Sequence, residues 1–272
     1  MNPLVSAGLV AALFLTVAAM ERIPRLRFAP YRFLRRHLAT DAAWYVIATT
    51  ANVVAAFVLL PMLSKLALPD VGATVRQLPW GSRFVMAVVL YDFCSFLMHV
   101  GLHRYEMLWS VHKVHHSSLQ LDWLATTRAH LMENLVRQVA AQIPLFVLGM
   151  KATIVAPTLM VYAAFALLGH SNLRVRGRWL ELVFVTPRIH RIHHIPATSQ
   201  QNFGTIFTLW DRLFARFLGA DTCPDERLGV PGEIDAYPQR LLPALRQPFR
   251  EIRSRRSAQG AGGVGLTSLG QG

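Results

Sequence analysis

The stretch HVGLHRYEMLWSVHKVHH, residues 99–116, holds five histidines, and HRIHH at residues 190–194 repeats the spacing of its last three. Ten of the eleven histidines lie between His99 and His194. Residues at i, i+3 and i+4 share one face of a helix, so each His-x2-His-His block is expected to offer three imidazoles to one point. Neutral imidazole binds iron, zinc, copper and nickel. The blocks therefore predict a two-metal site built from His99, His103, His112, His115, His116, His190, His193 and His194.

The composition indicates a membrane protein. Hydrophobic residues make up 53% of the 272 residues, charged residues only 16%, and the mean hydropathy is +0.34. These values are too apolar for a soluble domain of this length. The formal net charge of +13 lies mostly in short segments beside apolar runs. Anionic lipid headgroups explain this charge better than nucleic acid, which is not expected as a partner.

The apolar runs predict an all-α, polytopic integral membrane protein with about four to five membrane helices. The runs are 4–20, 42–63, 84–98 and 139–169. The last run is too long for one span if all histidines are to share a site, so a hairpin turning near Gly149 to Lys151 is expected. Arginines crowd the stretch 21–37, and the positive-inside rule places that stretch in the cytoplasm. The histidines then form a helical cap on the cytoplasmic face.

The chain divides into three expected parts. Residues 1–83 hold N-terminal membrane helices and a basic loop, 84–218 the histidine-rich catalytic domain, and 219–272 a partly disordered tail. Within the second part, residues 206–217 place apolar side chains at helical spacing and predict an amphipathic segment. The tail from Arg253 is rich in Arg, Ser and Gly and is expected to be disordered.

These blocks and their neighbours resemble the fatty acid hydroxylase and sterol desaturase superfamily of membrane di-iron oxygenases. The resemblance covers roughly residues 92–214 and is specific, because neighbours of the histidines agree in spacing too: Asp92, Leu108-Trp109, Ser117, Arg128-Ala-His130-Leu-Met-Glu133, His170-Ser171-Asn172, Thr186-Pro187-Arg188, Asn202-Phe-Gly204 and Trp210-Asp211-Arg212-Leu-Phe214. Three positions, Phe96, Val100 and Leu131, depart from the usual pattern, and none removes a core histidine.

The resemblance implies a ligand set for two iron ions. It adds His170 and His130 to the eight blocked histidines, which supplies about ten nitrogens for two metals. His130 is equally compatible with a place beside the substrate or behind a ligand. Zinc binds the same imidazoles, so it can replace iron in a purified sample.

Four carboxylates are candidates to accept the second ring N–H of a ligating histidine, which would set its tautomer and orientation: Asp92, Asp122, Glu133 and Asp211. Asp92 is the strongest candidate, because a carboxylate inside an apolar helix is costly unless it is paired. Alternatively, Asp122 and Glu133 are exposed charges, and Asp211 pairs with an arginine.

The resemblance further implies O2-dependent hydroxylation or desaturation of a lipid C–H bond. Candidate substrates are sterol-like lipids, fatty acyl chains, carotenoids and ether lipids. The chain has no believable nucleotide-binding fold, flavin motif or set of cluster cysteines. Electrons are therefore expected from a separate ferredoxin, or from a cytochrome with its reductase. The basic cytoplasmic surface is suited to an acidic carrier or to anionic membrane lipids.

The main alternative is a membrane metal-binding or metal-transport protein without oxygenase activity. A transport pathway needs ligands along a route at bilayer depth, whereas these histidines are expected at helix ends on one face. A haem carrier is disfavoured by adjacent pairs such as His115-His116, and a structural zinc site needs only four ligands.

Overall fold

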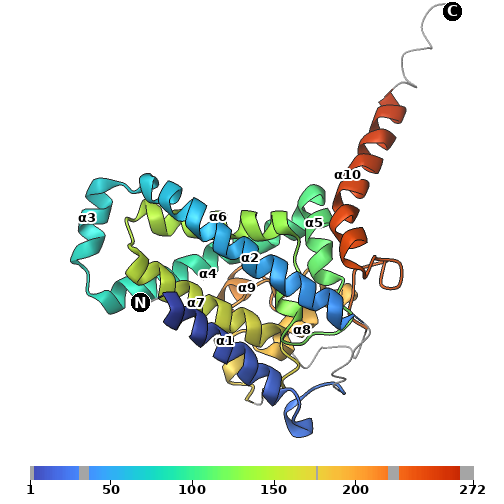
Figure 1. The fold of residues 1–272 in the computed structure, drawn as a ribbon, viewed down its shortest axis with the longest axis horizontal. Helices are drawn as coiled ribbons and strands as arrows, with labels where there is room; N and C mark the ends of the chain where they lie inside the picture. The colour runs from blue at the N-terminus through green and yellow to red at the C-terminus, as the bar shows by residue number, and fades with distance from the viewer. Residues whose placement is uncertain (1–2, 31–36, 176, 220–226, 264–272) are drawn as a thin grey trace, which may run out of the picture.

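The computed structural model describes residues 3–30, 37–175, 177–219 and 227–263. Within these ranges the regular structure is helical apart from two isolated β-bridges, and loops join the helices (Figure 1). Part of the arginine-rich stretch, 31–36, and the last residues, 264–272, lie outside the described residues. The helices are α1 (Pro3–Met20), α2 (Leu38–Leu63), α3 (Pro69–Gln77), α4 (Trp80–Arg104), α5 (Glu106–His116), α6 (Leu131–Val147), α7 (Ala152–His170), α8 (Pro187–His193), α9 (Leu209–Leu213) and α10 (Leu241–Gly263).

A bundle of long helices forms the body of the molecule, with α4 in contact with α5, α6 and α7, and α2 packed on α6 (Figure 1). Its core lies between these helices and includes Ala87, Tyr91, Leu145 and Ile154, each at most 5% exposed. The helix α1 lies along α7. The shorter helices α5 and α8 gather at one end of the bundle, so histidines from four helices meet there.

The polytopic class is confirmed. Three helical segments are long and apolar enough to cross a bilayer, namely Leu38–Leu66, Trp80–Arg104 and Ala152–His170, and Ala11–Met20 is a shorter apolar helix. Large apolar side chains on α2 face outwards, as expected for contact with lipid: Phe57 is 79% exposed. The predicted count of four to five membrane helices is reached only if α1, with 18 residues, or α6, with 17 residues, or both, also cross the bilayer.

The predicted hairpin in the long apolar run is present. The helices α6 and α7 are separated by residues 148–151, and Gly149 adopts a positive φ of 66°. A Cβ at Gly149 would lie only 2.9 Å from the Cα of Gly72 in α3, so a side chain there would push the two segments apart. The turn returns the chain to the end of the bundle where the histidines lie.

Two expectations about the C-terminal third were wrong. The amphipathic segment expected at 206–217 is helical only over the five residues of α9, because Trp210 donates to Asp92 of α4 and the fully buried Asp211 accepts from the backbone of the preceding loop at Phe203. The tail expected to be disordered from Arg253 continues as α10 to Gly263. Its first turns pack on α5, where Ala244 joins a core cluster that contains Val114, so tertiary packing overrides the local composition.

Candidate metal centre

Nine of the ten predicted histidines converge in two adjacent groups. The five-histidine group contains His99, His103, His112, His116 and His193, and the four-histidine group contains His115, His170, His190 and His194. Within each group, the candidate ligand nitrogens lie within 4.8 Å of one another. The groups touch, since the rings of His116 and His194 stack with centroids 4.5 Å apart.

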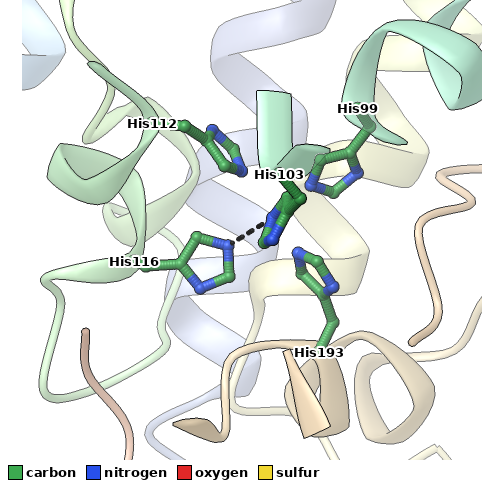
Figure 2. A group of neighbouring side chains, drawn as sticks. All are labelled: His99, His103, His112, His116 and His193. Atoms are coloured by element: carbon green, nitrogen blue, oxygen red, sulfur yellow. Dashed lines mark hydrogen bonds between the residues drawn. The ribbon is translucent and has the colours of Figure 1, made fainter. Parts of the chain in front are cut away.

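Each His-x2-His-His block serves both groups, contrary to the expectation that its three imidazoles point to one place. Figure 2 shows His112 and His116 of α5 facing the same group as His99 and His103 of α4. The intervening His115 belongs to the other group. Adjacent residues diverge by about 100° around a helix, so His115 and His116 point to different sides. The second block, on α8 and its C-cap, is divided the other way. His190 and His194 belong to the four-histidine group, and His193 belongs to the five-histidine group.

Hydrogen bonds orient three rings of the five-histidine group. Their Nδ1 atoms each contact an oxygen acceptor: His99 the Phe203 carbonyl at 2.8 Å, His112 Glu133 Oε1 at 2.9 Å, and His193 the Gln201 carbonyl at 2.8 Å. An Nδ1 that donates its hydrogen leaves the lone pair of a neutral ring on Nε2. The Nε2 atoms of these three residues are buried and have no hydrogen-bond partner. Three unsatisfied lone pairs therefore face the centre of the group.

In the four-histidine group, backbone carbonyls likewise orient two rings, and the Nε2 atoms of these rings lie close together. His115 Nδ1 lies 3.1 Å from the Arg128 carbonyl and His170 Nδ1 lies 2.7 Å from the Ala166 carbonyl. Both neutral rings then carry lone pairs on Nε2, yet these two Nε2 atoms are only 2.9 Å apart. Two lone pairs cannot satisfy each other, but a cation between them can. Ligands at right angles about a metal with bonds of about 2.05 Å lie about 2.9 Å apart.

Burial keeps five imidazoles of the two groups, all outside the membrane-crossing segments, neutral. It lowers the pKa of His193 to about 3, against a smaller opposing effect of its bond to the Gln201 carbonyl. Burial, reinforced by neighbouring histidines, also lowers the pKa values of His115, His116, His190 and His194 well below the ordinary value. Neutral imidazoles with inward lone pairs are the form that binds a metal ion. Both groups therefore fit a metal such as iron or zinc.

Among the four candidate carboxylates, Glu133 contacts a histidine as expected. It is 1% exposed, and Oε1 accepts from His112 Nδ1. The expectation was wrong for Asp92, whose oxygens accept the backbone N–H groups of Ile206 and Phe207 and the Trp210 indole N–H at 2.9–3.1 Å. It failed because the residues that Asp92 holds come from a segment more than 100 positions along the chain.

Asp211 also holds this segment instead of a histidine ring. Its two oxygens accept the backbone N–H groups of Phe203 and Gly204 at 2.7 and 2.9 Å. Since the Phe203 carbonyl accepts from His99, Asp211 supports a candidate ligand through the backbone. The tight approach is possible because residue 204 is glycine: a Cβ there would lie 2.6 Å from the Phe207 carbonyl oxygen.

His130 lies outside both histidine groups. Its Nδ1 accepts the Met132 N–H at 3.2 Å, which caps the start of α6, and its Nε2 lies 3.2 Å from the Leu245 carbonyl. In the tautomer that satisfies both contacts, no lone pair remains for a metal. Asp122 is buried and accepts the N–H groups of Leu124 and Ala125 at 3.0 and 3.2 Å.

Sequence reasoning missed a row of hydrogen-bonded polar side chains beside the two histidine groups. Arg137 Nη1 lies 3.3 Å from Glu133 Oε1, and Nη2 donates to the Tyr162 hydroxyl at 3.0 Å. That hydroxyl is 3.1 Å from Thr205 Oγ1. The i, i+4 spacing of Glu133 and Arg137 was a readable signal of an ion pair on one helix. The backbone carbonyls that orient His99, His115 and His193 have no such signal, because any residue type supplies them.

Comparison with known proteins gives a consistent result. The fatty acid hydroxylase family model matches residues 84–216. The chain is 31% identical over 175 residues to ornithine lipid hydroxylase OlsE of Rhizobium tropici, covering 64% of this chain and 52% of that protein. It is 28% identical over 147 residues, 53% of this chain, to alkylglycerol monooxygenase of Caenorhabditis elegans. It is 31% identical over 149 residues, 52% of this chain, to alkylglycerol monooxygenase of Danio rerio.

The matches cover about half of ornithine lipid hydroxylase and about a third of the alkylglycerol monooxygenases: 52% of the first, and 29% and 32% of the worm and fish proteins. No solved structure matches the chain. The matched region contains both histidine groups and the segment that orients His99 and His193.

Proposed function

Since the fatty acid hydroxylase family model matches residues 84–216, we propose that this chain is a member of that family and a membrane-bound di-iron oxygenase that hydroxylates or desaturates a lipid C–H bond. Residues 84–218 form its catalytic domain. The observation that carries this proposal is the pair of buried histidine groups: three Nε2 atoms of the five-histidine group have no hydrogen-bond partner, and the Nε2 atoms of His115 and His170 in the other group lie only 2.9 Å apart. An all-imidazole site of this size exceeds the needs of a single four-coordinate zinc ion.

The proposed ligands are the nine histidines of the two groups, and His130 caps α6 instead. When bound, two iron ions would activate O2 for attack on an unactivated C–H bond. The protein's own contribution is orientation. Glu133 and the carbonyls of Gln201 and Phe203 fix ring tautomers, while Asp92 and Asp211 hold the segment that carries these carbonyls. The burial of the histidine groups also excludes bulk water from the reacting groups.

The reaction balance requires an electron donor. Hydroxylation places one oxygen atom of O2 in the product and releases the other as water, which consumes two electrons and two protons from outside. Desaturation removes two hydrogens from the lipid and reduces both oxygen atoms to water. The donor is a separate ferredoxin, or a cytochrome with its reductase, that approaches the histidine centre from the cytoplasmic side.

The substrate is a membrane lipid. Two of the relatives named above are described as acting on an ornithine lipid and an alkylglycerol, and both descriptions specify a lipid that bears polar groups. Access from the bilayer suits a site at the end of a bundle of apolar helices, because the lipid then reaches the centre without crossing water.

Metal analysis tests the proposal directly. Protein purified in detergent from iron-supplemented cells should hold about two iron ions per chain, and His193→Ala should lower that content. The matched control is His130→Ala, which removes a histidine outside both groups and should retain wild-type metal content. The loaded wild type should then oxidise a lipid with a reductant and O2. Full metal content in His193→Ala would contradict the site, and a loaded protein without oxygenase turnover would favour a metal-binding or transport role.

A further inference from the structure

A large cavity lies between α2, α4, α6 and α7, next to the histidine centre. Its volume is about 480 Å³, and it extends along the bundle from Thr127 to Leu60. Arg137 and Ala166 line this cavity and also line a small pocket that contacts His99 and His170. These two residues therefore lie between the cavity and the histidine centre.

One wall of the cavity is a stripe of amides on α6. Asn134, Gln138 and Gln142 recur every four residues, so they share one face of the helix over about 12 Å. The side chain of Gln138 donates to Asn52 of α2 across the cavity. The opposing residues of α2 and α7 are mostly apolar, among them Leu59 and Leu159. The cavity thus has one polar wall and one apolar wall.

Two atoms of the amide stripe have no partner. Asn134 Nδ2, a donor, and Gln142 Oε1, an acceptor, are buried without a hydrogen bond, and Gln142 is only 4% exposed. Unsatisfied polar atoms among membrane helices are unfavourable and mark functional positions. Because one atom donates and the other accepts, the missing partner carries both kinds of group, as amides and hydroxyls do.

Arg137 adds donors at the end of the cavity nearest the histidines. It bonds to Glu133 and Tyr162, and its side chain is 30% exposed. A guanidinium has five N–H groups, so donors remain for an oxygen of a molecule in the cavity. Its charge is partly balanced by Glu133, which favours a neutral carbonyl or a single carboxylate over a highly charged group.

We propose that the cavity binds a polar lipid whose amide, ester or hydroxyl groups lie along α6, with its hydrocarbon chain against α2 and α7. The carbon oxidised at the histidine centre then lies within a few bonds of these polar groups, not in the middle of a hydrocarbon chain. This inference rests on the proposed function and narrows its substrate class. Pure hydrocarbons such as carotenes leave the amide stripe unsatisfied and are poor substrates.

Photolabelling tests the binding mode with the full-length protein in nanodiscs. The probe is N-palmitoyl glycine with a diazirine on its acyl chain, and the competitors are unlabelled N-palmitoyl glycine and hexadecane. We expect the label on residues that line the cavity, and competition by the amide but not by the alkane. In the double variant Asn134→Leu/Gln142→Leu, labelling should fall about tenfold, as expected for two lost hydrogen bonds. The exposed Gln77→Leu is the matched control and should label like the wild type.

Two further readouts separate binding from folding. Replacing the unpartnered Gln142 amide by leucine should not lower the thermal midpoint of lipid-free protein, whereas a purely structural amide would. Metal content should be unchanged in Gln142→Leu and in the double variant Asn134→Leu/Gln142→Leu. Label outside the cavity of the wild type, equal competition by hexadecane, or undiminished labelling of the double variant would each overturn the inference. Wild-type protein that labels as expected but holds no iron would instead contradict the proposed function.

Discussion

Replacing Glu133 by glutamine should weaken metal binding at the five-histidine group alone. Glutamine keeps the shape of the side chain but removes the charge that faces His112 Nδ1 at 2.9 Å and Arg137 Nη1 at 3.3 Å. Loss of such a partner behind a ligating histidine typically weakens metal affinity roughly 10- to 100-fold, which is about 1.4–2.8 kcal/mol. The four-histidine group should be spared, because His115 and His170 are oriented by backbone carbonyls that the substitution leaves in place.

A chelator titration with metal analysis measures this effect. Wild-type protein should lose its two metals over a narrow range of chelator, whereas Glu133→Gln should pass through a form with about one metal per chain. The control is Glu106→Gln, since Glu106 is 80% exposed and pairs with Arg255 at the surface. If Glu133→Gln and wild type lose metal at the same chelator concentration, the carboxylate does not support a ligand and the assignment of His112 fails.

Three other substitutions probe how the site is held. Asp92→Asn places an amide N–H opposite the donors of the 206–210 segment and should lower stability by about 1–3 kcal/mol, seen as a lower thermal midpoint in detergent; an unchanged midpoint would show that the contacts contribute little. Arg128→Met leaves Asp41 buried without this cation and should cost about 3–5 kcal/mol, with partial recovery in the double variant Arg128→Met/Asp41→Leu as the check. Lys113→Met removes the buried cation that binds two glutamates of the C-terminal region, so α10 should become more sensitive to trypsin, and unaltered digestion would argue against this anchor.

The convergence of the histidines could be predicted because helical spacing is a local property. The pairs His112/His116 and His190/His194 each share a group as i, i+4 spacing requires. The division into two groups could not be predicted, since it depends on where α5 and α8 lie relative to α4 and α7. The hairpin after α6 was predictable because two parts of the site had to return to one end of the bundle.

The supporting contacts were harder to predict, for a different reason. Asp92 stood out correctly as a buried carboxylate that needs partners, but its partners are backbone N–H groups of residues 206 and 207. Backbone groups leave no mark in a sequence, and loop geometry decides which of them point inwards. The helix α10 was missed for a similar reason, because its packing on α5 outweighs a composition rich in arginine, serine and glycine.

The sharing of α8 between both histidine groups also bears on biogenesis. Neither group is complete without this helix, which supplies His193 to one group and His190 and His194 to the other. The helix α8 follows α4, α5 and α7 in the chain and is therefore synthesised last of these four, so we expect metal incorporation to be a late event that follows membrane insertion. Released chains truncated before Pro187 should insert but should bind metal more weakly than the full chain, which labelling with radioactive iron can measure.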